Sequence, residues 1–154
     1  MMQNDKDIFF MKEAFKEACK AYSKKEVPVG AVVVLENQII ARAYNNRKQK
    51  NIFFGHAEFL ALIKTNKKLK NRHLNDISVY VTLEPCLMCA GALIQAGVKH
   101  LYYGANDYKT GCIDSITSSF NIPLSHKIIA KSGFLAKESS ELLKNFFQRL
   151  RKKD

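Results

Sequence analysis

The alternation of apolar and polar positions divides the chain into helical and strand-like segments. Apolar side chains recur at helical spacing in "IFFMKEAFKEACKAY", residues 8 to 22, and this predicts a helix with one buried face. Two β-branched runs in "EVPVGAVVVLENQIIARAY" predict an antiparallel pair of strands that turns at Glu36 and Asn37. By the same criteria we expect helices at 8–22, 56–67, 86–97 and 135–152, and strands at 30–35, 38–44, 77–83, 98–104 and within 127–133.

The order of these elements predicts the class of fold. From residue 77 onward strands and helices alternate, which favours parallel pairing through right-handed crossovers, with helices on both faces of the sheet. Added to the antiparallel pair, this order predicts an α/β protein with a mixed central sheet of about five strands between two helical layers. The 154 residues contain no internal repeat, low-complexity segment or linker, so we expect a single domain that spans 1–154.

Composition narrows the class of protein further. Hydrophobic residues make up 47% of the chain, but no apolar run approaches the ~20 residues that span a bilayer, so we expect no membrane association. The N-terminal stretch mixes charges with its apolar residues and lacks a small-residue cleavage site, which indicates a cytoplasmic protein. With 25 Lys+Arg against 14 Asp+Glu, the net charge of +11 attracts polyanions such as nucleic acids. The alternative is that the charge serves solubility alone, and composition does not decide between the two.

The four cysteines are too few for a disulfide framework in a domain of this size, and a reducing compartment keeps them as thiols. Cys19 lies within the first predicted helix, where we expect a small buried hydrophobe. Cys112 lies in a predicted loop, where we expect an accessible thiol. The other two, Cys86 and Cys89, form a C-x-x-C pair, which by itself fits a chance occurrence, a redox pair or half of a structural zinc site.

The C-x-x-C pair gains meaning from a histidine and a glutamate that precede it in the chain. His56 and Glu58 open one predicted helix, and Cys86 and Cys89 open the next. Cysteines three apart on a helix are neighbours, and the N–H groups at a helix start favour the thiolate form that metals bind. One imidazole and two thiolates suit tetrahedral zinc, and three protein ligands leave the fourth position to water, as in catalytic sites.

Glu58 distinguishes a catalytic zinc site from a structural one, because a carboxylate beside the water can take its proton and later deliver it to a leaving group. Residues two apart on an ideal helix point to nearly opposite sides. Both side chains can therefore serve one site only if His56 stands at the very start of its helix. The combination of H-x-E with P-C-x-x-C is the signature of zinc nucleobase deaminases.

Over nearly its whole length the sequence resembles the bacterial tRNA-specific adenosine deaminases. The resemblance is carried by "EVPVGAV" (26 to 32), "HAE" (56 to 58), "TLEPCLMCAGA" (82 to 92), "YGANDYKTG" (103 to 111) and "LLKNFFQRLRK" (142 to 152). The zinc motif alone would also fit deaminases of cytosine, guanine or cytidine, whereas the last two stretches resemble the tRNA branch. The resemblance implies a three-layer α/β/α cytidine-deaminase-like fold and the hydrolysis of adenosine to inosine at the wobble position of the tRNA anticodon.

The resemblance also implies roles for individual residues. One zinc ion per subunit would be held by His56, Cys86 and Cys89, with Glu58 as the proton shuttle. The substrate-binding positions that it implies are Val29, Asn45, Ala57, Asp107, Phe147 and Arg149. Among these, Asn45 would hydrogen-bond the flipped nucleoside and Asp107 would lie near its sugar. The implied partners are the tRNA anticodon stem-loop and a second copy of the chain in a homodimer.

The C-terminal segment interleaves cations with two phenylalanines. Its cations are Lys144, Arg149, Arg151, Lys152 and Lys153. They could neutralise phosphates while Phe146 and Phe147 stack on bases. A helix also needs an apolar face, so we expect one of the two phenylalanines in the core. The basic stretch "RKQK" at 47 to 50 fits either an RNA contact or a solvated face.

The sequence departs from the family in two loops near the predicted pocket. The family usually has Asp-Pro-Thr and a small residue before His-Ala-Glu, whereas this chain has "IFFG" at 52 to 55. Asp114 stands where the family has glycine, followed by the matching Ser115. These departures put the fit of the substrate in question, and one hypothesis is that Phe53 or Phe54 lines the nucleotide path.

Two other functions stay open from the sequence. The first is a deaminase of a free base or nucleoside, such as guanine or cytosine, in the same superfamily. The second is a non-catalytic RNA-binding module with structural zinc, against which Glu58 argues because a structural site needs no proton carrier.

Overall fold

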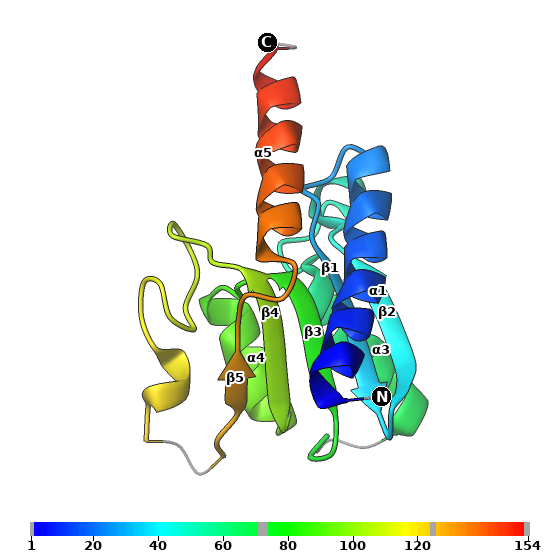
Figure 1. Cartoon of the computed structure of the whole chain (residues 1–154), viewed down its shortest axis with the longest axis vertical. Coiled ribbons are helices and arrows are strands. Elements are labelled where there is room, and N and C mark those ends of the chain that lie inside the picture. The colour runs from blue at the N-terminus through cyan, green and yellow to red at the C-terminus, as the bar shows by residue number, and fades with distance from the viewer. Residues whose placement is uncertain (1, 71–73, 124–125, 153–154) are drawn as a thin grey trace.

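The computed structural model describes residues 2–70, 74–123 and 126–152, and within them five strands form one mixed sheet (Figure 1). The helices are α1 (Gln3–Ser23), α2 (Arg47–Lys50), α3 (Ala57–Leu69), α4 (Leu87–Ala96) and α5 (Ala136–Lys152), with a 3-10 turn η1 (Ser119–Asn121). The strands are β1 (Gly30–Leu35), β2 (Gln38–Tyr44), β3 (Ser78–Leu83), β4 (His100–Ala105) and β5 (Ile129–Lys131). The predicted elements are confirmed with shifted ends, the largest shift being at the start of α1, and the short helix α2 was not among them.

The strand order is β2-β1-β3-β4-β5, in which β1 pairs antiparallel with both β2 and β3. The β3–β4 and β4–β5 pairs are parallel. Helices α1 and α5 pack on one face of this sheet, and α3 covers the other face with α4 beside it (Figure 1). The predicted α/β class, with a mixed sheet between two helical layers, is confirmed. In the described residues no helix combines the length and the apolar character that crossing a bilayer requires.

Both faces of β1 are buried, which explains its unbroken apolar sequence. Ala31 and Val33 belong to the core on the α3 and α4 side, whereas Val32 and Val34 join the core beneath α1. The turn into β2 places Glu36 at φ 50° and Asn37 at φ 63°. Two successive left-handed residues give the tight hairpin turn that matches the twist of the strands.

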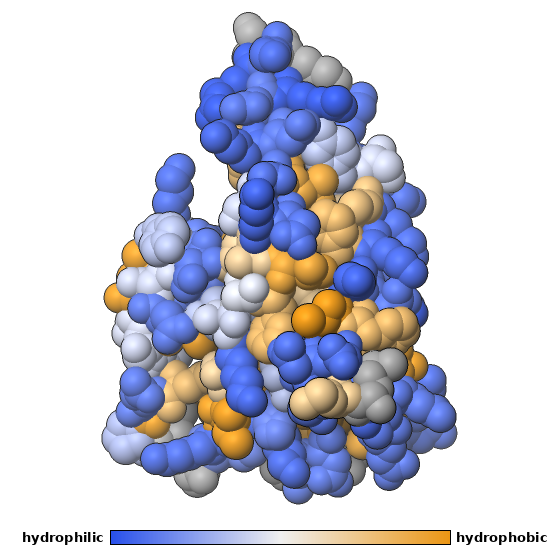
Figure 2. All heavy atoms as spheres, in the orientation of Figure 1, coloured by the Kyte–Doolittle hydropathy of each residue, from blue (hydrophilic) through white to orange (hydrophobic). Residues whose placement is uncertain are grey.

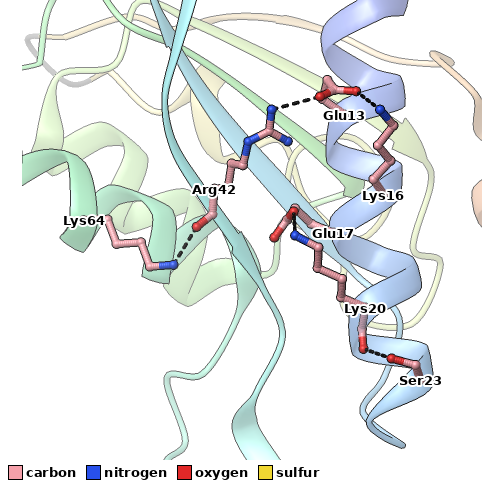
Figure 3. Close-up of polar contacts among 7 residues, drawn as sticks. All are labelled: Glu13, Lys16, Glu17, Lys20, Ser23, Arg42 and Lys64. Atoms are coloured by element: carbon pink, nitrogen blue, oxygen red, sulfur yellow. Dashed lines mark hydrogen bonds and ion pairs between the residues drawn. The ribbon is translucent and has the colours of Figure 1, made fainter.

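A polar network ties the edge strand β2 to the helices on both faces (Figure 3). The Arg42 guanidinium donates to Glu13 of α1 at 2.8 Å, and Lys16 contacts the other oxygen of the same carboxylate at 2.6 Å. From α3, the Lys64 ammonium donates to the backbone carbonyl of Arg42 at 2.6 Å. Lys16 and Arg42 hold the pKa of Glu13 below its ordinary value by donating to the carboxylate.

Four strands bring their neighbouring loops to one edge of the sheet. The parallel strands β3 and β4 both end there, so Glu84 and Asn106 begin adjacent loops. Because β1 runs antiparallel to β3 and β2, its start at Gly30 lies at the same edge, beside Tyr44 at the end of β2. Loops at the carboxyl ends of strands in α/β sheets are where ligands bind. The residues of the sequence motifs converge at this edge.

Candidate metal centre and its pocket

His56 and Cys86 each stand immediately before the first turn of a helix. Both have extended backbones, with φ −90° and ψ 142° at His56 and φ −77° and ψ 176° at Cys86. Their carbonyls accept the first hydrogen bonds of α3 and α4, at 2.9 and 2.8 Å. The structure thus places His56 at the very start of its helix, as the sequence predicts. Two helix N-termini, which stabilise negative charge, meet at one point.

The metal-ligating atoms of His56, Cys86 and Cys89 all lie within 4.8 Å of one another. Nδ1 of His56 is 3.5 Å from Sγ of each cysteine. Zn–N and Zn–S bonds of the usual lengths at a tetrahedral angle place nitrogen and sulfur about 3.6 Å apart. The donor set and its spacing therefore fit zinc with one position left open. Within the described parts of the chain this is the one group of three or more such residues close enough to hold a metal.

The pKa values of the three side chains in the cluster shift in different directions. The hydrogen bond from Cys89 is the largest of the effects that lower the pKa of Cys86 to about 4, and His56 adds to it. The pKa of Cys89 rises because Cys86 takes that hydrogen bond and because Cys89 is buried. The hydrogen bond with Cys86 raises the pKa of His56. The Cys86 thiolate thus lies beside two further metal-ligating groups, His56 and Cys89. A metal cation binds such a group of ligands by displacing their protons.

Glu58, in the first turn of α3, lies beside this cluster with 4% of its surface exposed. Burial is the largest effect on this carboxyl and raises its pKa to about 7. Since His56 precedes the helix and Glu58 lies within it, both side chains reach the same pocket. A carboxyl that titrates near neutrality can both accept and donate a proton, which is the property of a general acid and base.

A pocket of about 170 Å³ opens onto these groups. Its lining comprises Val27, Val29, Asn45, Arg47, His56, Ala57, Glu58, Leu83, Glu84, Cys86, Asp107 and Thr110. Four of the six predicted substrate-binding residues, at positions 29, 45, 57 and 107, therefore lie around the candidate metal centre. The other two, Phe147 and Arg149, come from α5 and line neighbouring hollows.

Asn45 and Asp107 already have protein partners in this pocket. The Asn45 amide donates to the Val27 carbonyl at 3.0 Å and accepts the Arg47 N–H at 3.1 Å, which leaves one donor and one lone pair of the amide. One Asp107 oxygen accepts the N–H groups of Lys109 and Thr110, both at 3.1 Å. The other accepts the Thr110 hydroxyl at 2.7 Å. Asp107 therefore shapes its own loop as well as lining the pocket.

A wider hollow of about 510 Å³ continues from the pocket and shares Val27, Asn45 and Arg47 with it. Phe53 lies on its wall with 73% of its surface exposed, and Phe147 contributes from α5. Its other members are Lys25, Glu26, Lys48, Asn51, Ile52, Phe146 and Leu150. This hollow lies between the C-terminal helix α5 and the loop with Ile52 and Phe53, where the sequence departs from the family.

The phenylalanines of each pair differ in their surroundings. Phe146 is buried and packs edge-on to Tyr22 of α1 at 6.0 Å between ring centroids, whereas Phe147 is 40% exposed. The prediction that one of these two lies in the core is confirmed. Phe54 packs against Phe59 of α3 at 5.8 Å, while Phe53 contacts Phe54 edge-on and otherwise faces outward.

The expectations for the two other cysteines are wrong. Cys19 is exposed, because the buried stripe of α1 passes through Ala18 and Ala21 and leaves residue 19 outside it. Cys112 is buried, because its loop folds back so that its N–H donates to the Pro85 carbonyl at 2.8 Å. Burial raises the pKa of the Cys112 thiol.

No role was assigned from the sequence to two buried acids that line the hollows at the site, Glu26 and Glu84. Glu26 accepts the N–H groups of Lys48 at 3.1 Å and Gln49 at 2.5 Å, and so anchors the first turn of α2. Glu84 lies in the quoted stretch "TLEPC" but received no role. Burial alone would raise the pKa of Glu84, yet hydrogen bonds from Asp114 and Ser115 and from other neighbours lower it to about 2. An acid inside a largely apolar stretch was the signal at Glu84, although it does not reveal the partner, whereas Glu26 follows two lysines and gives no such signal.

Comparison with known proteins identifies a family and relatives of this chain. The model of the MafB19-like deaminase family matches residues 4–151. A tRNA-specific adenosine deaminase of Rickettsia bellii is 44% identical over 144 residues, which is 92% of this chain and 99% of that protein. The Bacillus subtilis protein of the same name is 43% identical over 148 residues, which is 96% of this chain and 92% of that protein.

Solved structures agree with this relationship. A structure from a study of A-to-I editing by tRNA:A34 deaminases superposes with a TM-score of 0.84 at 39% identity, over 87% of this chain and 98% of that one. A guanine deaminase from Nitrosomonas europaea superposes with a TM-score of 0.77 at 22% identity, over 89% and 82% of the two chains. The second likeness shows the fold alone.

Proposed function

The chain belongs to the MafB19-like deaminases and, among them, to the tRNA-specific adenosine deaminases, and on this basis we propose that it hydrolyses adenosine to inosine at the wobble position of a tRNA anticodon. The observation that carries the proposal is the buried Glu58 beside the His56, Cys86 and Cys89 cluster, inside a pocket of about 170 Å³. Pockets for drug-sized ligands measure ~300–1,000 Å³, so this one suits a single base extruded from its strand.

The reaction adds water at C6 of adenine and releases ammonia. Zinc held by His56, Cys86 and Cys89 would supply a Lewis acid that makes water nucleophilic at neutral pH. Glu58 accepts the two protons of the attacking water in turn and delivers one to the ring nitrogen and the other to the departing amino group. Burial of Glu58 raises the pKa of its carboxyl, which favours proton return to the substrate. Atoms balance, since adenosine and water give inosine and ammonia.

The pocket walls orient the base for this attack. Val29 and Ala57 are buried and offer apolar contact to its faces. Asn45 keeps one amide donor and one acceptor site for the polar edge of the nucleoside. Asp107, from the loop after β4, also lines the pocket and would contact the sugar. An anticodon loop yields its base more cheaply than a duplex, because the base is not paired there.

The flanking nucleotides follow the wider hollow toward α5. Its members Lys25, Arg47 and Lys48 attract phosphates, and the exposed rings of Phe53 and Phe147 offer stacking surfaces. Phe53 thereby supplies an aromatic contact where relatives have a rigid turn, whereas Phe54 is held by packing.

The projecting end of α5 serves the RNA backbone. Figure 2 shows this end as hydrophilic, and α5 carries Arg149, Arg151 and Lys152 in its last turn. Arg149 lies over the Tyr22 ring at 5.7 Å from its centroid, which orients the guanidinium near the hollow that contains Lys25 and Lys152. Lys153 of the predicted basic set lies outside the described residues.

We also propose a homodimer that forms through α4. The sequence of this helix is apolar throughout except for Gln95, yet Leu87 is 62% exposed. A side chain added at Gly91 would meet nothing within 4 Å, so this position faces open space. Leu87, Gly91 and Ile94 share one helix face at i, i+4 and i+7 spacing, and a small residue between two apolar ones permits close approach of a second copy. For a protein that acts on tRNA we further propose a cytoplasmic location.

One assay separates the proposal from its rivals. Zinc-loaded protein is offered an anticodon stem-loop with adenosine at the wobble position, and separately guanine and cytosine. We expect inosine in the RNA and no release of ammonia from either base. Turnover of a free base without turnover of the stem-loop would assign the protein to the base deaminases.

The salt dependence of turnover adds an independent criterion. An enzyme that neutralises RNA phosphates loses affinity steeply as salt rises, whereas turnover of a neutral base responds little. RNA affinity with full zinc loading but no turnover of any of the three substrates would instead favour the structural-zinc module.

A further inference from the structure

Glu84 lies between the end of β3 and the cysteine-bearing start of α4, with 2% of its surface exposed. Its N–H donates to the Ala105 carbonyl at 2.9 Å, which continues the pairing of β3 with β4 past the strand ends. An acidic side chain in this position needs hydrogen-bond donors, since a buried charge without them is costly. Those donors come from one loop, residues 106–115.

One carboxylate oxygen of Glu84, Oε2, accepts three successive backbone N–H groups of this loop. They belong to Ile113 at 3.0 Å, Asp114 at 2.8 Å and Ser115 at 2.9 Å. Consecutive amides that converge on one point form an anion-binding concavity, which here is filled by a side chain of the same protein. The far end of the loop is thereby fixed.

The other oxygen, Oε1, holds the near end of the loop and closes it. It accepts the Asp107 N–H at 3.1 Å, the Asn106 amide at 3.1 Å and the Ser115 hydroxyl at 2.5 Å. The loop wraps the carboxylate so closely that a Cβ at Gly111 would stand 2.4 Å from Cδ of Glu84. Both ends and the middle of the loop therefore close around a single carboxylate.

The departure from the family at Asp114 does not disturb this arrangement. Asp114 donates its backbone N–H to Glu84, as any residue except proline could, and its own carboxylate accepts the Tyr103 hydroxyl. The matching Ser115 contributes both its N–H and its hydroxyl.

The loop that Glu84 fixes supplies Asp107 and Thr110 to the pocket, opposite the elements that supply His56 and Asn45. We propose that Glu84 is a positioning residue for substrate binding: its carboxylate holds this loop as the wall that receives the target nucleoside. The inference rests on the proposed function for the identity of the substrate. Glu84 acts through Asp107 and Thr110 and takes no part in the proton transfers.

The test is Glu84→Gln in the full-length, zinc-loaded protein, because the amide keeps the shape of the carboxylate. An NH₂ group cannot accept N–H groups, so one of the two oxygens loses all its donors. Each lost bond to a charged group is worth about a factor of ten or more, so we expect KM for the stem-loop to rise at least about tenfold. We expect kcat within about threefold of the wild type and zinc content unchanged.

Hydrogen exchange gives a readout that does not depend on activity. In Glu84→Gln we expect faster exchange at the amides of residues 107 and 113–115 and unchanged exchange in β1 and β3. Glu36→Gln, at an exposed turn remote from the site, is the matched control and should leave exchange and kinetics unchanged. Ser115→Ala removes only the hydroxyl bond to Oε1 and should give the same pattern in weaker form, which provides the test if Glu84→Gln does not fold.

Several outcomes overturn the proposal. Unchanged exchange in the loop means that Glu84 does not hold it, and faster exchange with unchanged KM means that the loop does not position substrate. A fall in kcat or zinc content with KM unchanged means that Glu84 acts on the metal centre instead. If the wild type fails to deaminate the stem-loop, the proposed function fails, while the exchange data still test whether Glu84 holds the loop.

Discussion

His56 and Cys86 occupy the same position on two different helices, each as the extended residue before the first turn, and Nδ1 of one lies 3.5 Å from Sγ of the other. This relationship lets Glu58 and Cys89, from within the same two helices, reach the site as well. Two helix starts that face each other combine ligands, a proton carrier and favourable dipoles without a dedicated loop.

The Glu58→Gln variant should lose turnover of the stem-loop by about 10²–10⁴-fold, the usual contribution of a general acid or base. The amide cannot carry the proton, but its shape preserves the pocket. We expect zinc content and RNA affinity to stay close to those of the wild type, measured by metal analysis and by filter binding. Full residual activity would show that another group carries the proton.

Chelation of the metal should destabilise the protein, because zinc binds the folded cluster in preference to the unfolded chain. If zinc is present at about a thousand times its Kd, the loss is ~4 kcal/mol, which lowers Tm by about 10 °C for a chain of this size. Cys86→Ser should remove the response to a chelator, while Cys19→Ser, at an exposed position, should keep it. Calorimetry with and without chelator measures both, and an unchanged Tm in the wild type contradicts a metal at this site.

Phe53→Ala and Phe54→Ala should separate RNA contact from packing. Phe53 is exposed on the hollow, and loss of base stacking costs ~1–3 kcal/mol, which raises KM for the stem-loop about 5- to 150-fold with Tm nearly unchanged. Phe54 packs on Phe59, so its truncation should lower Tm and change KM for the stem-loop less than Phe53→Ala does. Equal KM values for wild type and Phe53→Ala would show that Phe53 is an ordinary surface residue without a contact to RNA.

The Leu87→Lys variant should weaken the homodimer. A charge on the exposed apolar face of α4 would have to be desolvated at the interface, whereas in the monomer it faces water. Sedimentation of the wild type should give a dimer and that of the variant a monomer with unchanged circular dichroism. Lys67→Glu, an exposed change on α3, is the control, and a wild type that sediments as a monomer at all concentrations contradicts the proposal.

Glu13→Gln should lower stability at neutral pH but not in acid. Lys16 and Arg42 hold the pKa of Glu13 below its ordinary value of 4.5, so the charged form stabilises the fold fully above pH 4.5. This contribution, ~1 kcal/mol for a partly buried pair, is lost as pH falls through the lowered pKa. Urea unfolding should therefore separate the two proteins at pH 7 and bring them together once the pH has fallen below the lowered pKa of Glu13. A difference that is constant with pH would mean that shape, not charge, is responsible.

The sequence determined the elements and the candidate site. Helical and strand periodicities are local, and His56, Glu58, Cys86 and Cys89 state their chemistry by residue type and spacing alone. The position of His56 before the first turn of α3 also followed from the sequence. Two residues that are two positions apart within a helix point to different sides, so His56 can share a site with Glu58 only from outside the helix.

The tertiary structure decided which side chains are buried and what the unassigned polar groups do. Cys19 is exposed and Cys112 is buried, the reverse of what the sequence predicted, and only the structure shows that Phe146 and not Phe147 is buried. Burial depends on which distant segments pack against a residue. Glu84 acquired its role from backbone N–H groups of a loop far along the chain. Backbone donors are the same for every residue type, so their convergence on one carboxylate leaves no trace in the sequence and exists only once β3 and β4 lie side by side.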